Sequence, residues 1–233
     1  MLDFLFFAAH PDDAEIFCGG TVSRLVSQNY KVGIIDLTKG ELSTRGTVEI
    51  RAKETHEATK ILNIHHRSNL GIADGNIDNT QENRIKIEEA IREQKPKIVF
   101  VPYNEDRHPD HINASKVVTE ACFYSGLVKI ETKLPAFRPK SIIYYFSHVV
   151  REPSFIVDIS DYLETKIKAI KAFKSQFFNP DSTQPETFIS NKRFIESIEG
   201  RARYFGHQIG VEYGEPFFVK SKIKINNIYE IFS

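Results

Sequence analysis

Residues 2–15 read LDFLFFAAHPDDAE, and this stretch decides the fold. An apolar run of strand length ends at Ala9, and a histidine, a proline and two aspartates follow it directly. A second apolar run, IVFV at residues 98–101, leads in the same way to RHPDH at residues 107–111. In an open α/β sheet, the carboxyl ends of parallel strands form the ligand-binding edge. The two polar segments are therefore predicted to meet at that edge.

Strand-like and helix-like segments alternate outward from this stretch. Runs rich in Val, Ile, Phe and Tyr predict strands at residues 2–9, 31–38, 68–72, 97–103, 141–147 and 155–159. The 3.6-residue apolar period of residues 47–63, repeated at 81–94 and 113–124, predicts amphipathic helices between successive strands. This alternation predicts an α/β fold of three layers, α/β/α and Rossmann-like, with a mostly parallel sheet.

The second half departs from this rhythm. Residues 161–177 and 191–207 are expected to be helices, and the Asn-Pro and Gln-Pro pairs within residues 178–186 predict a turn-rich loop close to the site. The tail, residues 220–233, is expected to add an edge strand or an oligomer contact. A chain of this length can bury roughly 70% of its unfolded surface, so we expect residues 1–233 to form one domain.

Composition narrows the range of partners. Lysine plus arginine and aspartate plus glutamate number 31 each, so no net field attracts a nucleic acid or an anionic membrane. We therefore expect a small-molecule partner, no nucleic acid and no membrane. The apolar opening is too short to span a bilayer and lacks the features of a signal peptide. With two cysteines and no C-x-x-C motif, a reducing, cytoplasmic location is the expectation.

The two polar segments contain the ligand set of an open metal site. A catalytic zinc takes three protein ligands from His, Asp or Glu and keeps one position for water, and His10, Asp13 and His111 supply such a set. A further carboxylate can act as general base, a further histidine can stabilise an oxyanion or protonate a leaving group, and a second carboxylate can orient a histidine. The residues left for these roles are Asp12, His108 and Asp110. Spacing alone does not choose between Asp12 and Asp13, or between His108 and His111.

A purely structural interpretation competes with the metal site. Aspartates at helix starts often only cap free N–H groups, and Pro11 and Pro109 suit the first turn of a helix. The occurrence of both segments at two strand ends of one sheet favours a metal site over simple helix capping. The other histidines have no such company and are interpreted as surface or internally satisfied residues: His56, His65, His66, His148 and His207.

The motifs resemble those of the LmbE-like, or PIG-L, family of zinc-dependent N-acetylglucosamine deacetylases. The resemblance rests on HPDDAE at residues 10–15, GGT at 19–21 and HPDH at 108–111. It extends through TKGE at 38–41, VEIRAKE at 48–54, DGNI at 74–77 and GEPF at 214–217. It implies a metal site at the C-terminal edge of the strands, with one Zn²⁺ per chain, or Fe²⁺ or another divalent metal in its place. It also implies a homo-oligomer, with a hexamer among the expected forms.

The resemblance also assigns roles. It implies that His10, Asp13 and His111 hold the metal, that Asp12 is the catalytic base and that His108 is its electrophilic partner. Arg51 matches the substrate-binding arginine of the family, although it could instead pair with Glu54 or Glu41 on the helix surface. Glu41 and Asp74 match acidic positions that contact sugar hydroxyls. Arg107 is a second candidate cation for an anionic substrate group.

The branch that the chain resembles most is the bacillithiol-biosynthesis deacetylase, which hydrolyses the acetamide of N-acetylglucosaminyl L-malate. Another N-acetylglucosamine substrate, such as diacetylchitobiose, is the alternative. Where mycothiol-pathway relatives have a tyrosine, two positions before His108, this chain has Asp106. A phenol acting on the oxyanion would therefore have to come from elsewhere, with Tyr103 as a candidate.

Other classes of protein fit the sequence less well. Two histidines and a carboxylate also form the facial triad of non-haem Fe(II) oxygenases, but those sites usually lie on β-sandwiches. A nucleotide-binding module is disfavoured because no G-x-G-x-x-G or Walker-A loop occurs. A non-catalytic metal-binding regulator would have no use for Asp12 and His108 beside the ligands.

Overall fold

A computed structural model describes residues 1–227 and 229. Its strands are β1 (Phe4–Ala8), β2 (Val32–Asp36), β3 (His66–Asn69), β4 (Ile98–Pro102), β5 (Ser141–Tyr145), β6 (Phe155–Asp158) and β7 (Gly214–Phe218). Its helices are α1 (Asp13–Ser27), α2 (Val48–Leu62), α3 (Gln81–Gln94), α4 (Pro109–Tyr124), the 3-10 turn η1 (Ser160–Tyr162), α5 (Leu163–Lys171) and α6 (Lys192–Gln208).

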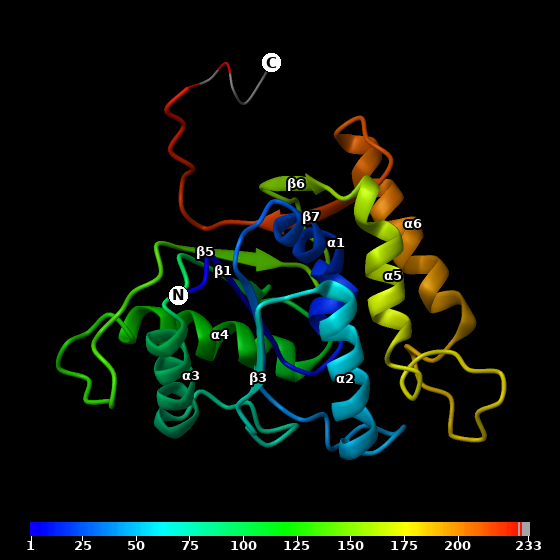
Figure 1. Ribbon diagram of the computed structural model, residues 1–233, viewed down its shortest axis with the longest axis horizontal. Coiled ribbons are helices and arrows are strands. Elements are labelled where there is room, and N and C mark those ends of the chain that lie inside the picture. The colour runs from blue at the N-terminus through cyan, green and yellow to red at the C-terminus, as the bar shows by residue number, and fades with distance from the viewer. Residues whose placement is uncertain (228, 230–233) are drawn as a thin grey trace.

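The strands form one sheet of order β3-β2-β1-β4-β5-β7-β6. The first five strands of that order are parallel, whereas β7 runs antiparallel to both β5 and β6. Helices α3 and α4 pack together on one face, and α1, α2 and α5 pack together on the other (Figure 1). The predicted three-layer α/β/α fold with a mostly parallel sheet is confirmed.

Strand β1 lies in the centre of the sheet and its residues alternate between the two cores. Phe6 and Ala8 join the core beneath α1, α2 and α5, while Leu5, Phe7 and Ala9 join the core beneath α3 and α4. All five are fully buried. Because helices cover both faces of the sheet at β1, the sequence of this strand is a continuous apolar run. Packing on both faces also holds the carboxyl end of the strand in a fixed position.

Helix α1 was not among the helices predicted from periodicity. Gly19 and Gly20 lower helix propensity, but both allow close packing. A Cβ at Gly20 would lie 2.7–2.8 Å from Ile159, and one at Gly19 would lie 3.0 Å from Lys166. Helix α4 also begins earlier than predicted, at Pro109 instead of residue 113.

Strand β7 was missed because it contains Pro216, which cannot donate a ladder hydrogen bond and usually marks an edge strand. The strand is internal, but its pairing with β5 is confined to Phe217 and Phe218, so Pro216 lies beyond it. The predicted edge strand in the tail is not formed by residues 220–227. The rest of that prediction, at residues 228 and 230–233, falls outside the described residues.

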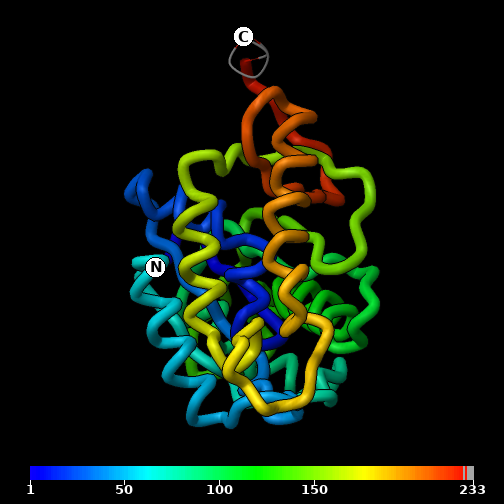
Figure 2. Tube along the Cα trace, turned by 90° about the vertical axis from the view of Figure 1, so that its right-hand side faces the viewer, coloured from blue at the N-terminus to red at the C-terminus, as the bar shows by residue number. Residues whose placement is uncertain are grey.

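The predicted helix over residues 161–177 is shorter, because α5 ends at Lys171. Ser175 then donates hydrogen bonds from its backbone N–H and its hydroxyl to the Glu54 carboxylate, each 2.7 Å long, which turns the chain away from the helix axis. The loop that follows joins α5 to α6 (Figure 2). Arg45 holds this loop through hydrogen bonds to the Ser182 hydroxyl and the Pro185 carbonyl.

Aromatic residues in the second half divide between core and surface. Phe177, Phe194 and Phe205 are buried within the chain. Phe178 and Tyr204 remain exposed. No helix within the described residues is long and apolar enough to cross a membrane.

Candidate metal centre and catalytic cavity

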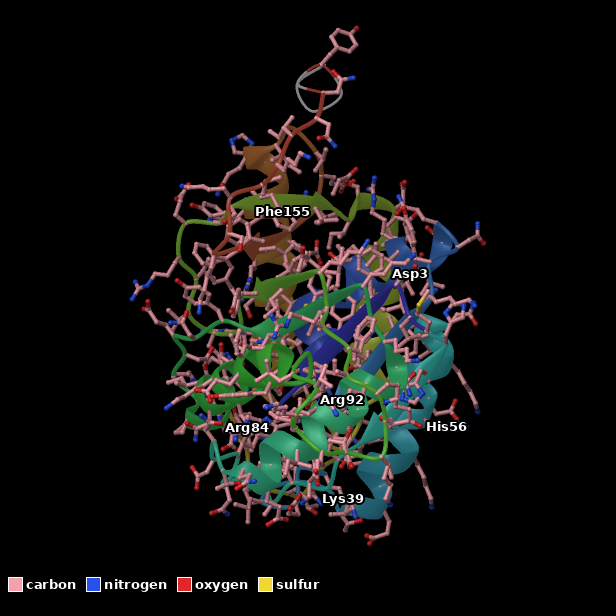
Figure 3. The ribbon with its side chains drawn as sticks, turned by 90° about the vertical axis from the view of Figure 1, so that its left-hand side faces the viewer. Asp3, Lys39, His56, Arg84, Arg92 and Phe155 are labelled. Carbon is pink, nitrogen blue, oxygen red and sulfur yellow. The ribbon has the colours of Figure 1, made fainter. Side chains whose placement is uncertain are left out.

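A cavity of about 470 Å³ lies where β1 and β4 end, as predicted for the two polar segments. Every predicted site residue except Glu41 lines it. A larger cavity of about 570 Å³ lies beside α2 and β3, where Lys39 and His56 are labelled in Figure 3. Within the described part of the chain, the clusters of side chains suited to a metal all contain His10 or His111, which line the first cavity. The first cavity is therefore the candidate site.

The turn after β1 has a strained backbone and is held by hydrogen bonds from helix α2. Asp12 has a φ of 121°, a backbone conformation that side-chain-bearing residues rarely adopt. Arg51 of α2 donates hydrogen bonds from Nε and Nη2 to the Pro11 carbonyl, at 3.1 and 2.7 Å, and from Nη2 to Asp12 Oδ2 at 2.7 Å. This local strain at a polar residue in a cavity is typical of a functional position.

The second segment is shaped by the start of α4. His108 is the N-cap residue, and its Nδ1 accepts the backbone N–H of Asp110 at 3.3 Å. Pro109 occupies the first turn, where its missing N–H costs nothing. Because His111 lies one turn beyond the cap, the His108 and His111 rings stack with centroids 4.9 Å apart and both face the cavity.

The ligand atoms of His10, Asp13 and His111 lie within 4.8 Å of one another, and the distances from Asp13 to the two rings fit a small divalent cation. The two carboxylate oxygens of Asp13 face two different rings, with Oδ2 lying 3.4 Å from His10 Nδ1 and Oδ1 lying 3.3 Å from His111 Nε2. Both distances exceed the 2.7–2.9 Å of a charge-assisted hydrogen bond. Ligand atoms about 2.0–2.1 Å from a tetrahedral metal lie roughly 3.3–3.4 Å apart. His10, Asp13 and His111 therefore fit a zinc-type site.

The outer nitrogen of each histidine faces carboxylates. His111 Nδ1 lies 3.3 Å from Asp106 Oδ1, while His10 Nε2 lies 3.1 Å from Asp74 Oδ1 and 3.2 Å from Asp110 Oδ2. Such partners fix the orientation of a ligating ring and increase its basicity. The Asp110 carboxylate thus lies against the His10 ring, where it can orient that ring. Sequence reasoning noted Asp106 only as a departure from a motif and missed its contact with His111.

The electrostatics of the site favour an added cation. Burial alone would lower the pKa of His10, but Asp110, Asp13 and Asp74 outweigh it and hold this pKa well above its usual value. Likewise, burial would raise the pKa of Asp13, but His111 and His10 hold it well below its usual range. Each imidazole thus takes up a proton to balance the surrounding carboxylates, a role that a bound divalent ion would fill instead.

Asp12 differs from Asp13 in its surroundings. Burial raises the pKa of Asp12 to about 7, although the Arg51 guanidinium opposes the shift. A carboxylate with a pKa near neutrality suits proton transfer. Arg51 also donates to Gln176 Oε1 at 3.3 Å, so most of its donors are already engaged with the chain. The surface ion pairs with Glu54 or Glu41 considered for Arg51 do not form.

The structure corrects two expectations about substrate contacts. Glu41 is exposed and outside the cavity, because its carboxylate accepts the backbone N–H groups of Lys39 and Asp74 at 3.2 and 2.9 Å. It thus positions the loop that holds Asp74. Tyr103 does not reach the cavity either, because its ring packs against Tyr144, Phe146 and Phe218.

Two further groups complete the cavity wall. Arg107 is exposed, and its guanidinium lies 3.8 Å from the centre of the Phe188 ring. His148 was interpreted as a surface or satisfied histidine, but its ring stacks on His111 with centroids 5.7 Å apart. Its backbone N–H donates to Asp106 Oδ2 at 2.8 Å. Burial lowers the pKa of His148 to about 4, so the ring is neutral. No spacing motif links His148 to the two polar segments.

The fold and site together define an α/β protein that can hold a divalent metal at the carboxyl edge of its sheet. A model of the PIG-L family, described as GlcNAc-PI de-N-acetylase, matches residues 5–122. The chain belongs to this family. It is 31% identical to a diacetylchitobiose deacetylase of Thermococcus kodakarensis, with 88% of this chain and 78% of the relative covered.

Solved structures agree with this assignment. The conserved protein TT1542 of Thermus thermophilus is 36% identical, with a TM-score of 0.90 over 98% of this chain and 99% of its own. The N,N'-diacetylchitobiose deacetylase of Pyrococcus horikoshii, solved with an inhibitor, is 28% identical, with a TM-score of 0.81 over 93% of this chain and 82% of its own.

Replacing Asp106 by asparagine tests the contact with His111. We expect Asp106→Asn to weaken zinc binding by about 10- to 100-fold, because the His111 ring loses its carboxylate partner. Competition with a chromophoric chelator measures the affinity. The matched control is Glu105→Gln at the neighbouring position, where the carboxylate pairs with Arg151 at the surface. Equal zinc affinity in both variants and the wild type would show that Asp106 does not support the site.

Proposed function

We propose that this protein is a metal-dependent hydrolase that removes the N-acetyl group from an N-acetylglucosamine conjugate. The observation that carries the proposal is the juxtaposition of the buried Asp12 carboxylate with the His10, Asp13 and His111 cluster in one cavity. Membership of the PIG-L family and the names of the relatives support the same reaction. His10, Asp13 and His111 would hold the metal, and zinc is the ion proposed for this donor set.

A divalent ion bound there would make a water molecule acidic and polarise the acetyl carbonyl. Asp12 accepts a proton from the attacking water as the oxygen bonds to the carbonyl carbon. The same carboxyl group can return that proton to the nitrogen as the C–N bond breaks, so that acetate and a free amine leave. Arg51 keeps Asp12 in place throughout, because it binds both the carboxylate and the preceding carbonyl.

His108 acts as a hydrogen-bond donor to the developing oxyanion. Its Nδ1 accepts the Asp110 N–H, which places the ring proton of the neutral imidazole on Nε2. The neutral form is favoured because burial lowers the pKa of His108, and His10 and His111 lower it further. A positioned donor of this kind typically contributes about 10²- to 10³-fold to the rate.

The central test replaces Asp12 by asparagine. In Asp12→Asn the side-chain amide keeps an oxygen that accepts the Arg51 hydrogen bond, so we expect an intact fold and normal metal content. Amine release should fall by about 10²- to 10⁴-fold because the general base is lost. Turnover close to that of the wild type, in a variant shown to contain metal, would exclude Asp12 as the base.

The names of the relatives favour a chitobiose-like disaccharide over the malyl conjugate as the substrate. Arg107 is the specific observation that favours N-acetylglucosaminyl L-malate, the substrate of bacillithiol biosynthesis. Among the arginines that line the cavity, Arg51 is engaged with Pro11 and Asp12, whereas Arg107 forms no ion pair with any described residue. A guanidinium in this position suits a substrate carboxylate.

A substrate panel with one variant separates these two conjugates. If the malyl conjugate is the substrate, Arg107→Gln should lower its kcat/KM by about tenfold or more, because a charge-assisted hydrogen bond is lost. The kcat/KM for diacetylchitobiose should change little. Arg151→Gln, which removes an exposed arginine outside the cavity, is the matched control. Equal losses for both substrates would contradict recognition of the malyl group by Arg107.

Two further properties belong to the proposal. We expect the protein to act in the cytoplasm, because its two cysteines form no C-x-x-C motif, and to form a homo-oligomer, as the resemblance of the motifs implies. Phe178 and Tyr204 are among the exposed aromatic side chains available for such an interface, whereas Phe177, Phe194 and Phe205 are buried in the core.

A further inference from the structure

A second chamber lies directly behind the catalytic cavity. It measures about 240 Å³ and lies between α6, the start of α1 and β7. Ile16, Phe17, His148 and Phe188 line both the chamber and the catalytic cavity, so these side chains form a shared wall. The Phe17 ring lies 6.2 Å from the ring of His111, which places this wall beside the metal ligands. A water molecule occupies about 30 Å³, so the chamber has room for a small organic ion.

The chamber contains an arginine with unused donors. Arg201 of α6 donates from Nη2 to the Phe146 carbonyl at 2.6 Å and from Nη1 to the Ser147 carbonyl. A guanidinium has five N–H donors. No carboxylate among the described residues lies within ion-pair distance of Arg201. Burial lowers the pKa of Arg201 to about 10, although Glu215 and Asp106 oppose the shift, so the group remains charged at neutral pH.

The other charges of the chamber compensate one another. Lys166 Nζ lies 2.5 Å from Glu215 Oε1. Glu215 also accepts the backbone N–H groups of Gly20 and Thr21 at 3.0 and 2.7 Å. Its carboxylate is therefore fully engaged and not free to turn toward Arg201. The ionised side chains that line the chamber, Lys166, Arg201 and Glu215, carry a net charge of +1.

We propose that this chamber is a binding site for a small carboxylate and that it receives the acetate released by deacetylation. The second half of the statement rests on the proposed function. The lining matches both ends of such an ion, because Arg201 can take the carboxylate while Ile198, Ala202 and Phe194 offer an apolar surface to the methyl group. The shared wall at Phe17 and His148 puts the chamber next to the point where the C–N bond breaks.

Binding of acetate to the metal-free protein tests the site without any catalysis. Titration calorimetry should detect acetate, whereas acetamide, which has the same shape but no charge, should bind at least about tenfold more weakly, because it lacks the charge-assisted contact. Arg201→Met should weaken acetate binding by about 10- to 100-fold, because a charge-assisted bidentate contact is lost. Arg203→Met is the matched control, since Arg203 is an exposed arginine of the same helix that pairs with Glu199.

The outcomes are distinct. Equal affinity for acetate and acetamide, or equal acetate affinity in the wild type and Arg201→Met, would overturn the proposal. If Arg201→Met does not fold, Arg201→Lys keeps the charge without the planar fork, and it should bind acetate several-fold more weakly. Wild-type affinity in that variant would also overturn the proposal. Arg201-dependent acetate binding in a protein that releases no amine from any acetylated sugar would leave the site intact and contradict only the proposed function.

Discussion

The need to balance carboxylates at one edge of the sheet is the constraint on which the site depends. Asp13, Asp74, Asp106 and Asp110 surround two buried imidazoles, and Arg51 is engaged by Asp12. Buried charges are costly unless they are paired or bind metal. A divalent cation between His10, Asp13 and His111 satisfies this requirement, and the 3.3–3.4 Å separations of their donor atoms leave the space for it. The strained Asp12, held by Arg51, lies beside these three residues in the same cavity.

The rest of the fold positions this edge. Strand β1 fixes His10 between the two cores, and the N-terminal cap of α4 fixes His108 and His111. The Glu215 carboxylate of β7 accepts the backbone N–H groups of Gly20 and Thr21. These hydrogen bonds attach α1, the helix that begins at Asp13, to strand β7 of the sheet. Gln176 donates to the Arg45 carbonyl and accepts from Arg51, so the loop between α5 and α6 is coupled to the turn that carries Asp12.

Sequence patterns predicted the sheet, most helices and the juxtaposition of the two polar segments, because these follow from strand ends and periodicity. Helix α1 was not predicted because Gly20 has low helix propensity, and strand β7 was not predicted because Pro216 cannot donate a ladder hydrogen bond. Only the tertiary packing accommodates each residue in its element. Asp106 was noted only as a departure from a motif, although it lies five positions before His111, and His148 was missed because the β5–β6 connection brings it to His111 without any fixed spacing. Glu41 was assigned to the substrate on a motif, but its carboxylate holds the Asp74 loop. The catalytic roles of Asp12 and His108 stay predictions.

Zinc binding by the metal-stripped protein tests the central claim most directly. The measurement combines the metal content after dialysis with the unfolding temperature as zinc is added. One zinc should be retained per chain, and the unfolding temperature should rise with zinc concentration, because an ion that binds only the folded state stabilises it. Asp13→Ala should abolish both effects, since Asp13 contacts both histidines. A wild-type protein that retains no divalent ion and unfolds at the same temperature with and without zinc would contradict the account.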